Sequence, residues 1–294
     1  MSETIRAMNI RKRIEKAATG FTPSERKLAS VLLSDYPYAG LIKMHELADR
    51  AEVSQPSISR FVIKIGLSGF PELQKHLVSE LREGDRSPVD IHATSEQIKG
   101  GYLNGFLRLA AEQMASAGQA VTESQFEQIC GLLADPKRAI YAVGGRISDT
   151  IALHLSFHLR QSRERIYHLP RDPDVWPEYL LRMKPGDVFF LVDFRRYQKN
   201  LWQLAKQAQA QKVQVVLMTD HWLSPATRYS SEVLVVPIET GTIWDSYAPA
   251  LALTEALVTR VAEKTWPQTR KRIEAWDAMR DGIMERKHEQ VIDR

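Results

Sequence analysis

Side chains that can contact nucleic acid are concentrated in one short stretch, residues 54–64. Its hydroxyl, amide and cationic groups are Ser54, Gln55, Ser57, Ser59, Arg60 and Lys64. Hydroxyl and amide groups reach phosphates and base edges, and arginine binds either, when a helix lies in the major groove. These residues therefore predict DNA binding, provided that the stretch forms an exposed helix.

A second set of candidate groups follows two apolar runs, Ala139–Val143 and Val188–Val192. The candidates are Gly144, Gly145, Arg146 and Ser148 after the first run, Asp193, Arg195 and Arg196 after the second, and His221 farther along. Glycine lets a backbone approach a ligand closely, a serine at a helix N-terminus favours an anion, and arginines bind carboxylates and phosphates through paired donors. We expect a site for a small anion here. A plain strand-to-helix turn, with arginines that pair with Asp193 and Glu239 and close the pocket, is the alternative.

The first set is positioned by two short apolar runs of helical period. Met44, Leu47, Ala48 and Ala51 make one face, and Ile58, Phe61, Val62 and Ile65 make the other. The break at residues 52–54 is short enough only for a tight turn, Ser54 is a good N-cap, and Pro56 suits a first helical turn. The pattern predicts a helix-turn-helix. An ordinary helical hairpin with solvated serines is the alternative.

The second set is positioned by apolar runs that alternate with helical segments. The runs are Ala139–Val143, Val188–Val192, Val213–Met218, Val233–Val236 and the weaker Ile166–Leu169. Such alternation predicts a five-stranded parallel sheet flanked by helices, whose ligands bind beyond the carboxyl ends of the strands. A helix striped with apolar residues is expected over Tyr247–Lys264.

Composition excludes several classes of protein. The chain has 294 residues, 44% of them hydrophobic and 26% charged, which leaves room for two domains. It has no apolar run near the roughly 20 residues of a membrane span, and its start is polar, so we expect a cytoplasmic protein. Cys130 is the only cysteine, which excludes internal disulfides and cysteine-built zinc sites. His154 and His158 have a spacing that could bind metal, but without a third ligand nearby we predict no metal site, no cofactor and no catalytic residues.

Four segments are predicted from these patterns. They are an all-helical DNA-binding domain at 1–81, a polar linker at 82–94, an α/β effector and dimerisation domain at 95–280, and a frayed polar tail at 281–294. Within the first, a basic helix is expected over about residues 4–18, and Thr22 to Glu25 resembles a capping box. Residues 1–86 hold 14 Lys and Arg against 11 Asp and Glu, a mild excess that suits a polyanionic partner.

The stretch HELADRAEVSQPSISRFVIKIGLSGFPELQKHL resembles the N-terminal domain of RpiR-family transcription regulators. The second half is similar to the SIS domain, a phosphosugar-binding module, because Gly144, Ser148 and Ala152 fit its GxGxSxxxA pattern. Arg146 replaces its second glycine, and Asp193 to Gln198 (DFRRYQ) replaces its second loop, SxSGxT. We therefore expect the SIS fold, but the usual phosphosugar ligand does not follow from the resemblance.

The resemblance implies a regulator that binds an operator, most simply an inverted repeat in double-stranded DNA, as a homodimer or homotetramer. Its effector would be a small anionic metabolite of the sugar-phosphate or sugar-acid type. A SIS-type sugar-phosphate isomerase, or a binding protein with an accessory helical domain, is the alternative, and a protein–protein adaptor is a third reading.

Overall fold

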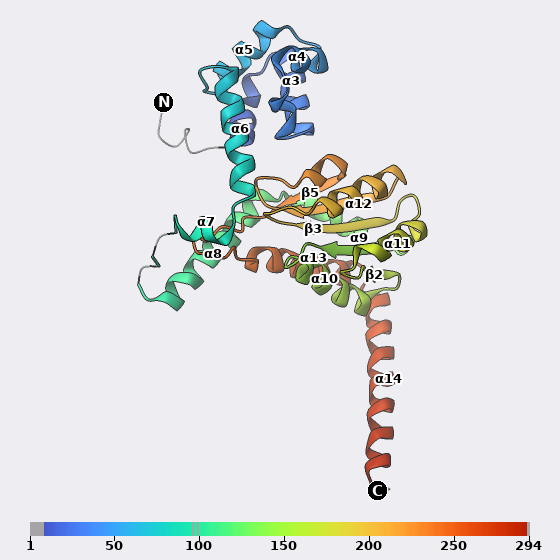
Figure 1. The fold of residues 1–294 in the computed structure, drawn as a ribbon. Helices are drawn as coiled ribbons and strands as arrows, with labels where there is room; N and C mark the ends of the chain where they lie inside the picture. The colour runs from blue at the N-terminus through green and yellow to red at the C-terminus, as the bar shows by residue number, and fades with distance from the viewer. Residues whose placement is uncertain (1–8, 96, 99, 293–294) are drawn as a thin grey trace. The chain divides into compact units, whose positions relative to one another are not determined.

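The computed structural model describes residues 9–95, 97–98 and 100–292, and its contacts divide the chain into two compact units, Met1–Ser87 and Pro88–Arg294 (Figure 1). The division falls within the predicted linker, 82–94. Helix α6 enters this segment and ends at Gly84, and the short helix α7 occupies Pro88–His92.

The N-terminal unit is all-helical, as predicted. Its elements are α2 (Ile10–Ala17), η1 (Ala18–Gly20), α3 (Pro23–Ser34), η2 (Tyr38–Leu41), α4 (Met44–Ala51), α5 (Gln55–Lys64) and α6 (Phe70–Gly84). The capping box at the start of α3 is confirmed, since the Thr22 N–H donates to Glu25 Oε2 (2.7 Å) and the Glu25 N–H donates to Thr22 Oγ1 (3.3 Å). Part of the basic helix predicted over residues 4–18 lies outside the described residues, and α2 begins at Ile10.

Glu80 joins three parts of this unit. Its carboxylate accepts the Ile10 N–H at the start of α2 (2.8 Å) and the Tyr36 hydroxyl. Burial raises the pKa of Glu80, although both hydrogen bonds oppose that rise. The Glu80 side chain therefore satisfies one of the free N–H groups at the N-terminus of α2. Because Glu80 belongs to α6, this hydrogen bond fixes the start of α2 to α6.

The C-terminal unit alternates helices and strands. After α7 come α8 (Tyr102–Ala120), α9 (Glu123–Ala134), β1 (Ile140–Gly144), α10 (Asp149–Ser162), β2 (Ile166–His168), η3 (Pro173–Val175), α11 (Trp176–Arg182), β3 (Val188–Asp193), α12 (Lys199–Ala210), β4 (Gln214–Thr219), η4 (Pro225–Tyr229), β5 (Glu232–Val235), α13 (Ala248–Lys264) and α14 (Trp266–Ile292). All five strands expected from the sequence are present, and no end differs from its expected position by more than one residue.

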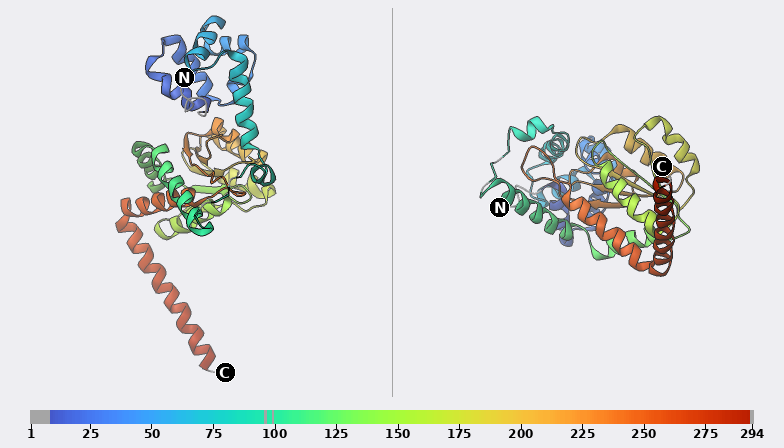
Figure 2. Two further views of the ribbon diagram at one scale, coloured as in Figure 1. Left: turned by 90° about the vertical axis from the view of Figure 1, so that its left-hand side faces the viewer. Right: turned by 90° about the horizontal axis from the view of Figure 1, so that it is seen from below.

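The sheet is parallel throughout, with the strand order β2-β1-β3-β4-β5. Helices α9, α10 and α13 pack on one face, where the buried side chains include Cys130, Leu155 and Leu257, and α11, α12 and η4 pack on the other. Figure 2 shows α13 (orange) beside α10 (yellow-green) in the first of these layers. Cys130 lies on a buried position of α9, and burial raises its pKa to about 11.

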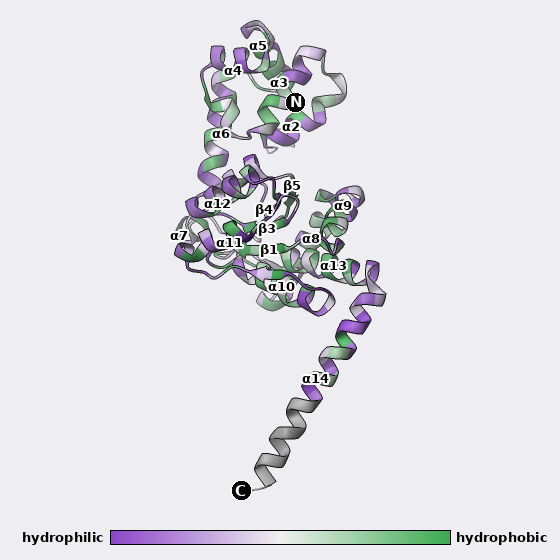
Figure 3. Cartoon of the chain, turned by 90° about the vertical axis from the view of Figure 1, so that its right-hand side faces the viewer, coloured by the Kyte–Doolittle hydropathy of each residue, from purple (hydrophilic) through white to green (hydrophobic). Residues whose placement is uncertain are grey.

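The last helix of the chain continues into the segment expected as a polar tail, residues 281–294. Helix α14 continues to Ile292, and Figure 3 shows that its described part is largely hydrophilic. Two salt bridges between residues three or four apart, Arg270 with Glu274 and Arg280 with Asp277, stabilise this helix from its own side chains. No helix in the described part of the chain has the length and apolar character needed to cross a membrane.

Candidate functional site

The predicted helix-turn-helix is formed by α4 and α5. Glu52 takes the left-handed conformation (φ 50°) after α4, and the Val53 N–H donates to the Ala48 carbonyl (2.9 Å), which closes the turn. Ile58, Phe61 and Val62 are buried on the inner face of α5. The apolar spacing that predicted this motif therefore also sets which face of α5 is exposed.

The candidate DNA-binding residues Ser54, Gln55, Ser57, Ser59 and Arg60 lie together at the start of α5 and on its outer side. The Ser54 and Ser57 hydroxyls are 2.9 Å apart, and Arg60 Nη2 donates to Ser57 Oγ (3.3 Å). Helix α5 contains no acidic residue. The helix thus offers hydroxyl, amide and guanidinium donors to a polyanion and carries no negative charge of its own.

Lys64 is placed differently from the rest of the set. Its Nζ donates to the Gly20 carbonyl (2.6 Å) and forms a salt bridge with Glu25 (2.7 Å). Burial raises the pKa of Glu25, but its hydrogen bonds to Lys64 and Thr22 outweigh burial, so that the pKa is lowered. In this structure Lys64 holds α5 against the N-terminus of α3.

The second candidate site lies where the order of the strands reverses, between β1 and β3. A pocket of about 470 Å³ lies beyond the carboxyl ends of these strands. It is lined by Gly144, Gly145, Arg146, Arg171, Trp176, Gln198, Lys199 and Asn200. Open parallel sheets bind ligands at such a reversal. The predicted loop after β1 contributes Gly144 to Arg146, and the other lining residues follow β2 and β3.

The turn after β1 is held by short contacts that require glycine. A Cβ atom on Gly144 would lie 2.6 Å from the backbone of Asp149, closer than real structures allow. The Gly145 N–H donates to Ser148 Oγ (2.9 Å), and that hydroxyl donates to the Val192 carbonyl of β3 (2.9 Å). Ser148 is buried at the start of α10, where its hydroxyl fixes the turn to the neighbouring strand.

One wall of the pocket is held by a buried carboxylate, Asp149. It accepts the Gly144 N–H (2.9 Å), bonds to His168 Nε2 (2.9 Å) and lies 3.4 Å from Arg171 Nε. Burial raises the pKa of Asp149, but the hydrogen bond and charge of His168 and the other two contacts outweigh burial, so that the pKa is lowered. The ionised carboxylate thus holds Arg171 by its Nε, and the arginine side chain remains 69% exposed at the rim.

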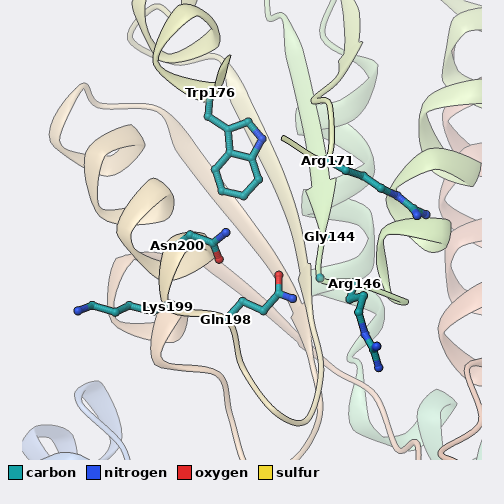
Figure 4. A pocket seen from close by; sticks show the side chains of 8 residues that line it. Gly144, Arg146, Arg171, Trp176, Gln198, Lys199 and Asn200 are labelled. Carbon is teal, nitrogen blue, oxygen red and sulfur yellow. The ribbon is translucent and has the colours of Figure 1, made fainter. Parts of the chain in front are cut away.

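The pocket combines a neutral polar interior with a cationic rim. Figure 4 shows the Trp176 ring and the amides of Gln198 and Asn200 directed into the space, whereas Arg146, Arg171 and Lys199 are directed away from its centre. Among the described lining residues none is acidic. Amides exchange hydrogen bonds with hydroxyl groups, an aromatic face covers an apolar surface, and long cationic side chains can turn toward an anion.

Arg195 lies outside this pocket, in a cluster that we call the Arg195 clamp: Arg195, Trp222, Glu239 and Asp245. The guanidinium lies 3.9 Å from the Trp222 ring centre, 3.0 Å from Glu239 Oε1 and 3.4 Å from Asp245 Oδ2. Its side chain is only 4% exposed. The alternative in which the arginines close the pocket expected them to pair with Asp193 and Glu239. In the structure Arg195 pairs with Glu239, but its second acidic partner is Asp245 and not Asp193.

Two buried carboxyl groups, Asp193 at the end of β3 and Asp220 after β4, lie near the start of the loop that contains Arg195. Asp193 accepts the Ser224 hydroxyl (2.5 Å), and Asp220 accepts the Tyr197 hydroxyl (2.5 Å) and the Arg195 N–H (2.6 Å). Burial raises the pKa of Asp193 to about 7 and that of Asp220 to about 6. The two carboxyls order the loops that follow β3 and β4.

The other two candidates lie at the surface beside the clamp. Arg196 is exposed and has a left-handed backbone (φ 65°). His221 is half-buried, with its ring on Trp222 and its Nε2 3.6 Å from Glu239 Oε2. The rings of His154 and His158 are in contact, tilted by 54° with their centres 4.5 Å apart, and the described residues hold no group of three or more His, Cys, Asp or Glu that could bind a metal ion.

Two family models match the chain. A helix-turn-helix domain of the rpiR family covers residues 8–84, and a SIS domain covers residues 132–260. HexR, an HTH-type transcriptional regulator of Escherichia coli strain K12, is 23% identical over 263 residues, 88% of this chain and 85% of HexR. An uncharacterized HTH-type transcriptional regulator from Caldanaerobacter subterraneus is 23% identical over 265 residues, 86% of this chain and 85% of that protein.

Solved structures share the fold. The Vibrio vulnificus NanR protein complexed with ManNAc-6P has a TM-score of 0.52 at 17% identity and covers 94% of this chain and 99% of its own. The sugar isomerase domain of an RpiR transcription factor from Sphaerobacter thermophilus has a TM-score of 0.56 at 17% identity, over 60% of this chain and 98% of its own. With an rpiR-type helix-turn-helix at its start and a SIS domain after it, the chain belongs to the RpiR family of transcription regulators.

Proposed function

We propose that this regulator binds an inverted-repeat operator as a dimer or higher oligomer through α5. We further propose that a small sugar phosphate or sugar acid in the pocket between β1 and β3 controls that binding. The observation that carries the DNA-binding part is the exposed, acid-free face of α5 in a closed helix-turn-helix. Its donors lie at the start of the helix, which enters the major groove first in motifs of this kind.

The DNA-binding part is tested by gel shift with genomic fragments at several salt concentrations. Arg60→Ala lowers affinity by roughly 1–3 kcal/mol and relaxes preference at one base pair if Arg60 contacts a base. If Arg60 contacts phosphate, affinity falls evenly for all sequences and the salt slope drops by about one. Lys75→Ala removes the same charge from an exposed position on α6 and serves as the control. Wild-type affinity in the Arg60→Ala, Gln55→Ala double variant would remove α5 from the interface.

The effector part is supported by the chemistry of the pocket. The amides of Gln198 and Asn200 suit hydroxyl groups, and the rim cations Arg146, Arg171 and Lys199 suit a phosphate or carboxylate. NanR, of similar fold, is complexed with ManNAc-6P. Control of DNA binding further requires that the ligand favour one arrangement of the DNA-binding heads, because a ligand indifferent to both shifts nothing.

A thermal-shift screen tests the effector part, with sugar phosphates, phosphorylated sugar acids, keto acids and neutral sugars side by side. At a hundred times its dissociation constant a true ligand adds roughly 2.7 kcal/mol, or about 5–10 °C for a domain of this size. Arg171→Ala reduces this shift, whereas Arg182→Ala, an exposed arginine outside the pocket lining, leaves it unchanged. Stabilisation by neutral sugars alone, or by an anion equally well in Arg171→Ala, would contradict the proposal. A stabilising anion that leaves operator affinity unchanged would contradict its regulatory part.

A further inference from the structure

One residue of α5 breaks the division between a buried apolar face and an exposed polar one. Ile63 is 62% exposed, whereas Ile58, Phe61 and Val62 of the same helix are fully buried. In the described part of the N-terminal unit, the large apolar side chains that are exposed are Ile63 and Val78, and Val78 is only 38% exposed. The hydrophobic core of the unit therefore does not account for Ile63.

Its position on the helix places Ile63 with the candidate DNA-binding groups. Residues three and four apart share a helix face, so Ile63 lies one turn beyond Ser59 and Arg60 on the same side. Lys64, the next residue, is turned back toward Glu25 and Gly20 and does not extend this face. The outer face of α5 thus runs from Gln55 through Ser59 and Arg60 to a single branched apolar side chain.

We propose that Ile63 contacts the C5 methyl group of a thymine in the major groove and thereby makes the protein prefer an A·T pair at one operator position. This inference rests on the proposed binding of DNA by α5. Among the bases, only thymine presents a methyl group in that groove, and apolar side chains are the groups that read it. A β-branched side chain is stiff in a helix, so it loses little rotamer freedom when the methyl group is enclosed.

The surroundings of Ile63 favour DNA over a protein partner. An interface with a protein is marked by a contiguous apolar patch of a few hundred Å². Here the neighbours on the exposed face are a hydroxyl and a guanidinium, Ser59 and Arg60, and the helix carries no acid. Donors with positive charge and one apolar contact match a groove that offers phosphates, base edges and one methyl group.

The experiment uses the full-length protein and a duplex that it selects from a random-sequence pool. Each thymine of that duplex is replaced in turn by deoxyuridine, which keeps the base pair and removes only the C5 methyl group. We expect the affinity of wild type to fall roughly fourfold per half-site when uracil stands at one symmetric position, because burying one methyl-sized group contributes about 0.8 kcal/mol. Ile63→Ala shows a similar loss on the unmodified duplex and is indifferent to uracil at that position. Ile63→Val keeps the uracil effect in weakened form.

Val78→Ala, which trims the other exposed apolar residue of the unit, is the matched control and keeps the wild-type pattern. Because Ile63 is exposed, melting temperatures of the variants should equal that of wild type, which separates a lost contact from a lost fold. If wild type tolerates uracil at every position, or if Ile63→Ala remains sensitive at the same position, the methyl contact is overturned while DNA binding stands. If the full-length protein selects no duplex, the proposed function itself fails.

Discussion

Replacing Arg195 distinguishes a structural clamp from a ligand-binding arginine. In Arg195→Ala the stacking on Trp222 is lost, and Asp245, whose side chain is 18% exposed, is left without its cation. Stacking at a desolvated site contributes about 0.5–2 kcal/mol, and an abandoned polar partner costs about 1–3 kcal/mol. Glu239 is 44% exposed and is rehydrated, so its loss of the cation costs little, and the total loss of stability is about 1.5–5 kcal/mol.

The assay is thermal unfolding of the protein without any ligand. At about 2–4 °C per kcal/mol, the transition of the α/β domain falls by roughly 3–20 °C in Arg195→Ala. Arg195→Lys keeps a charge but loses the planar stacking and the fork of donors, so we expect about half of that fall. Arg196→Ala removes the same charge from the adjacent exposed position and should cost no more than about 0.5 kcal/mol.

The burial of Asp245 raises its pKa, and Arg195 opposes that rise, so the pKa of Asp245 rises further in Arg195→Ala. The variant should therefore lose more stability, relative to wild type, as pH rises and this carboxyl ionises. Suppose that Arg195→Ala has the same melting temperature as wild type but no longer gains stability from an anion that stabilises wild type. Arg195 is then a ligand-binding group, and its structural role in the clamp is refuted.

Three further predictions concern the same domain. Gly144→Ala should destabilise the chain by roughly 1–3 kcal/mol and abolish its stabilisation by anions, because the added Cβ displaces Asp149. Urea unfolding with and without the anion measures both effects. A variant that unfolds and responds to the anion like wild type would contradict this prediction. Because burial raises the pKa of Asp193 to about 7, its contribution to stability is complete below about pH 4 and is lost as pH rises through 7. Asp193→Asn should flatten that part of the stability–pH curve, and a curve parallel to wild type would exclude this carboxyl. Leu253→Lys, in the apolar groove between α8, α9 and α13, should weaken self-association in sedimentation, and an unchanged oligomer would place the interface elsewhere.

The sequence predicts those features that depend on neighbours along the chain. Apolar period alone identifies all five strands and the faces of α4 and α5, because burial of side chains selects both. The capping box at Thr22 and Glu25 is equally local. The sequence did not indicate how far α14 extends, because the composition of residues 281–294 is polar.

The site was predicted only in part because its residues meet through the fold. Arg171 and Trp176 follow β2, the weakest strand signal, and nothing in their local sequence indicates that they lie opposite Gly144. Lys64 and Glu25 are 39 residues apart, so a cation that looks available for DNA is already paired. The two acidic partners of Arg195 come from the segment after β5, for which the sequence offered Glu239 but not Asp245. Two adjacent arginines after a buried strand suggested an anion site. The order of the strands, which the sequence does not state, decides which cationic side chains line the pocket.

The contacts of α5 have a consequence for how this regulator can evolve. The residues that hold the helix in place, Ile58, Phe61, Val62 and Lys64, are different from those on its outer face, Gln55, Ser59, Arg60 and Ile63. Substitutions on the outer face therefore leave the fold nearly unchanged in stability, as is usual for surface positions. On the proposed mode of DNA binding, one copy could acquire a new operator after gene duplication by single substitutions at these four positions, none of which lies in the C-terminal unit.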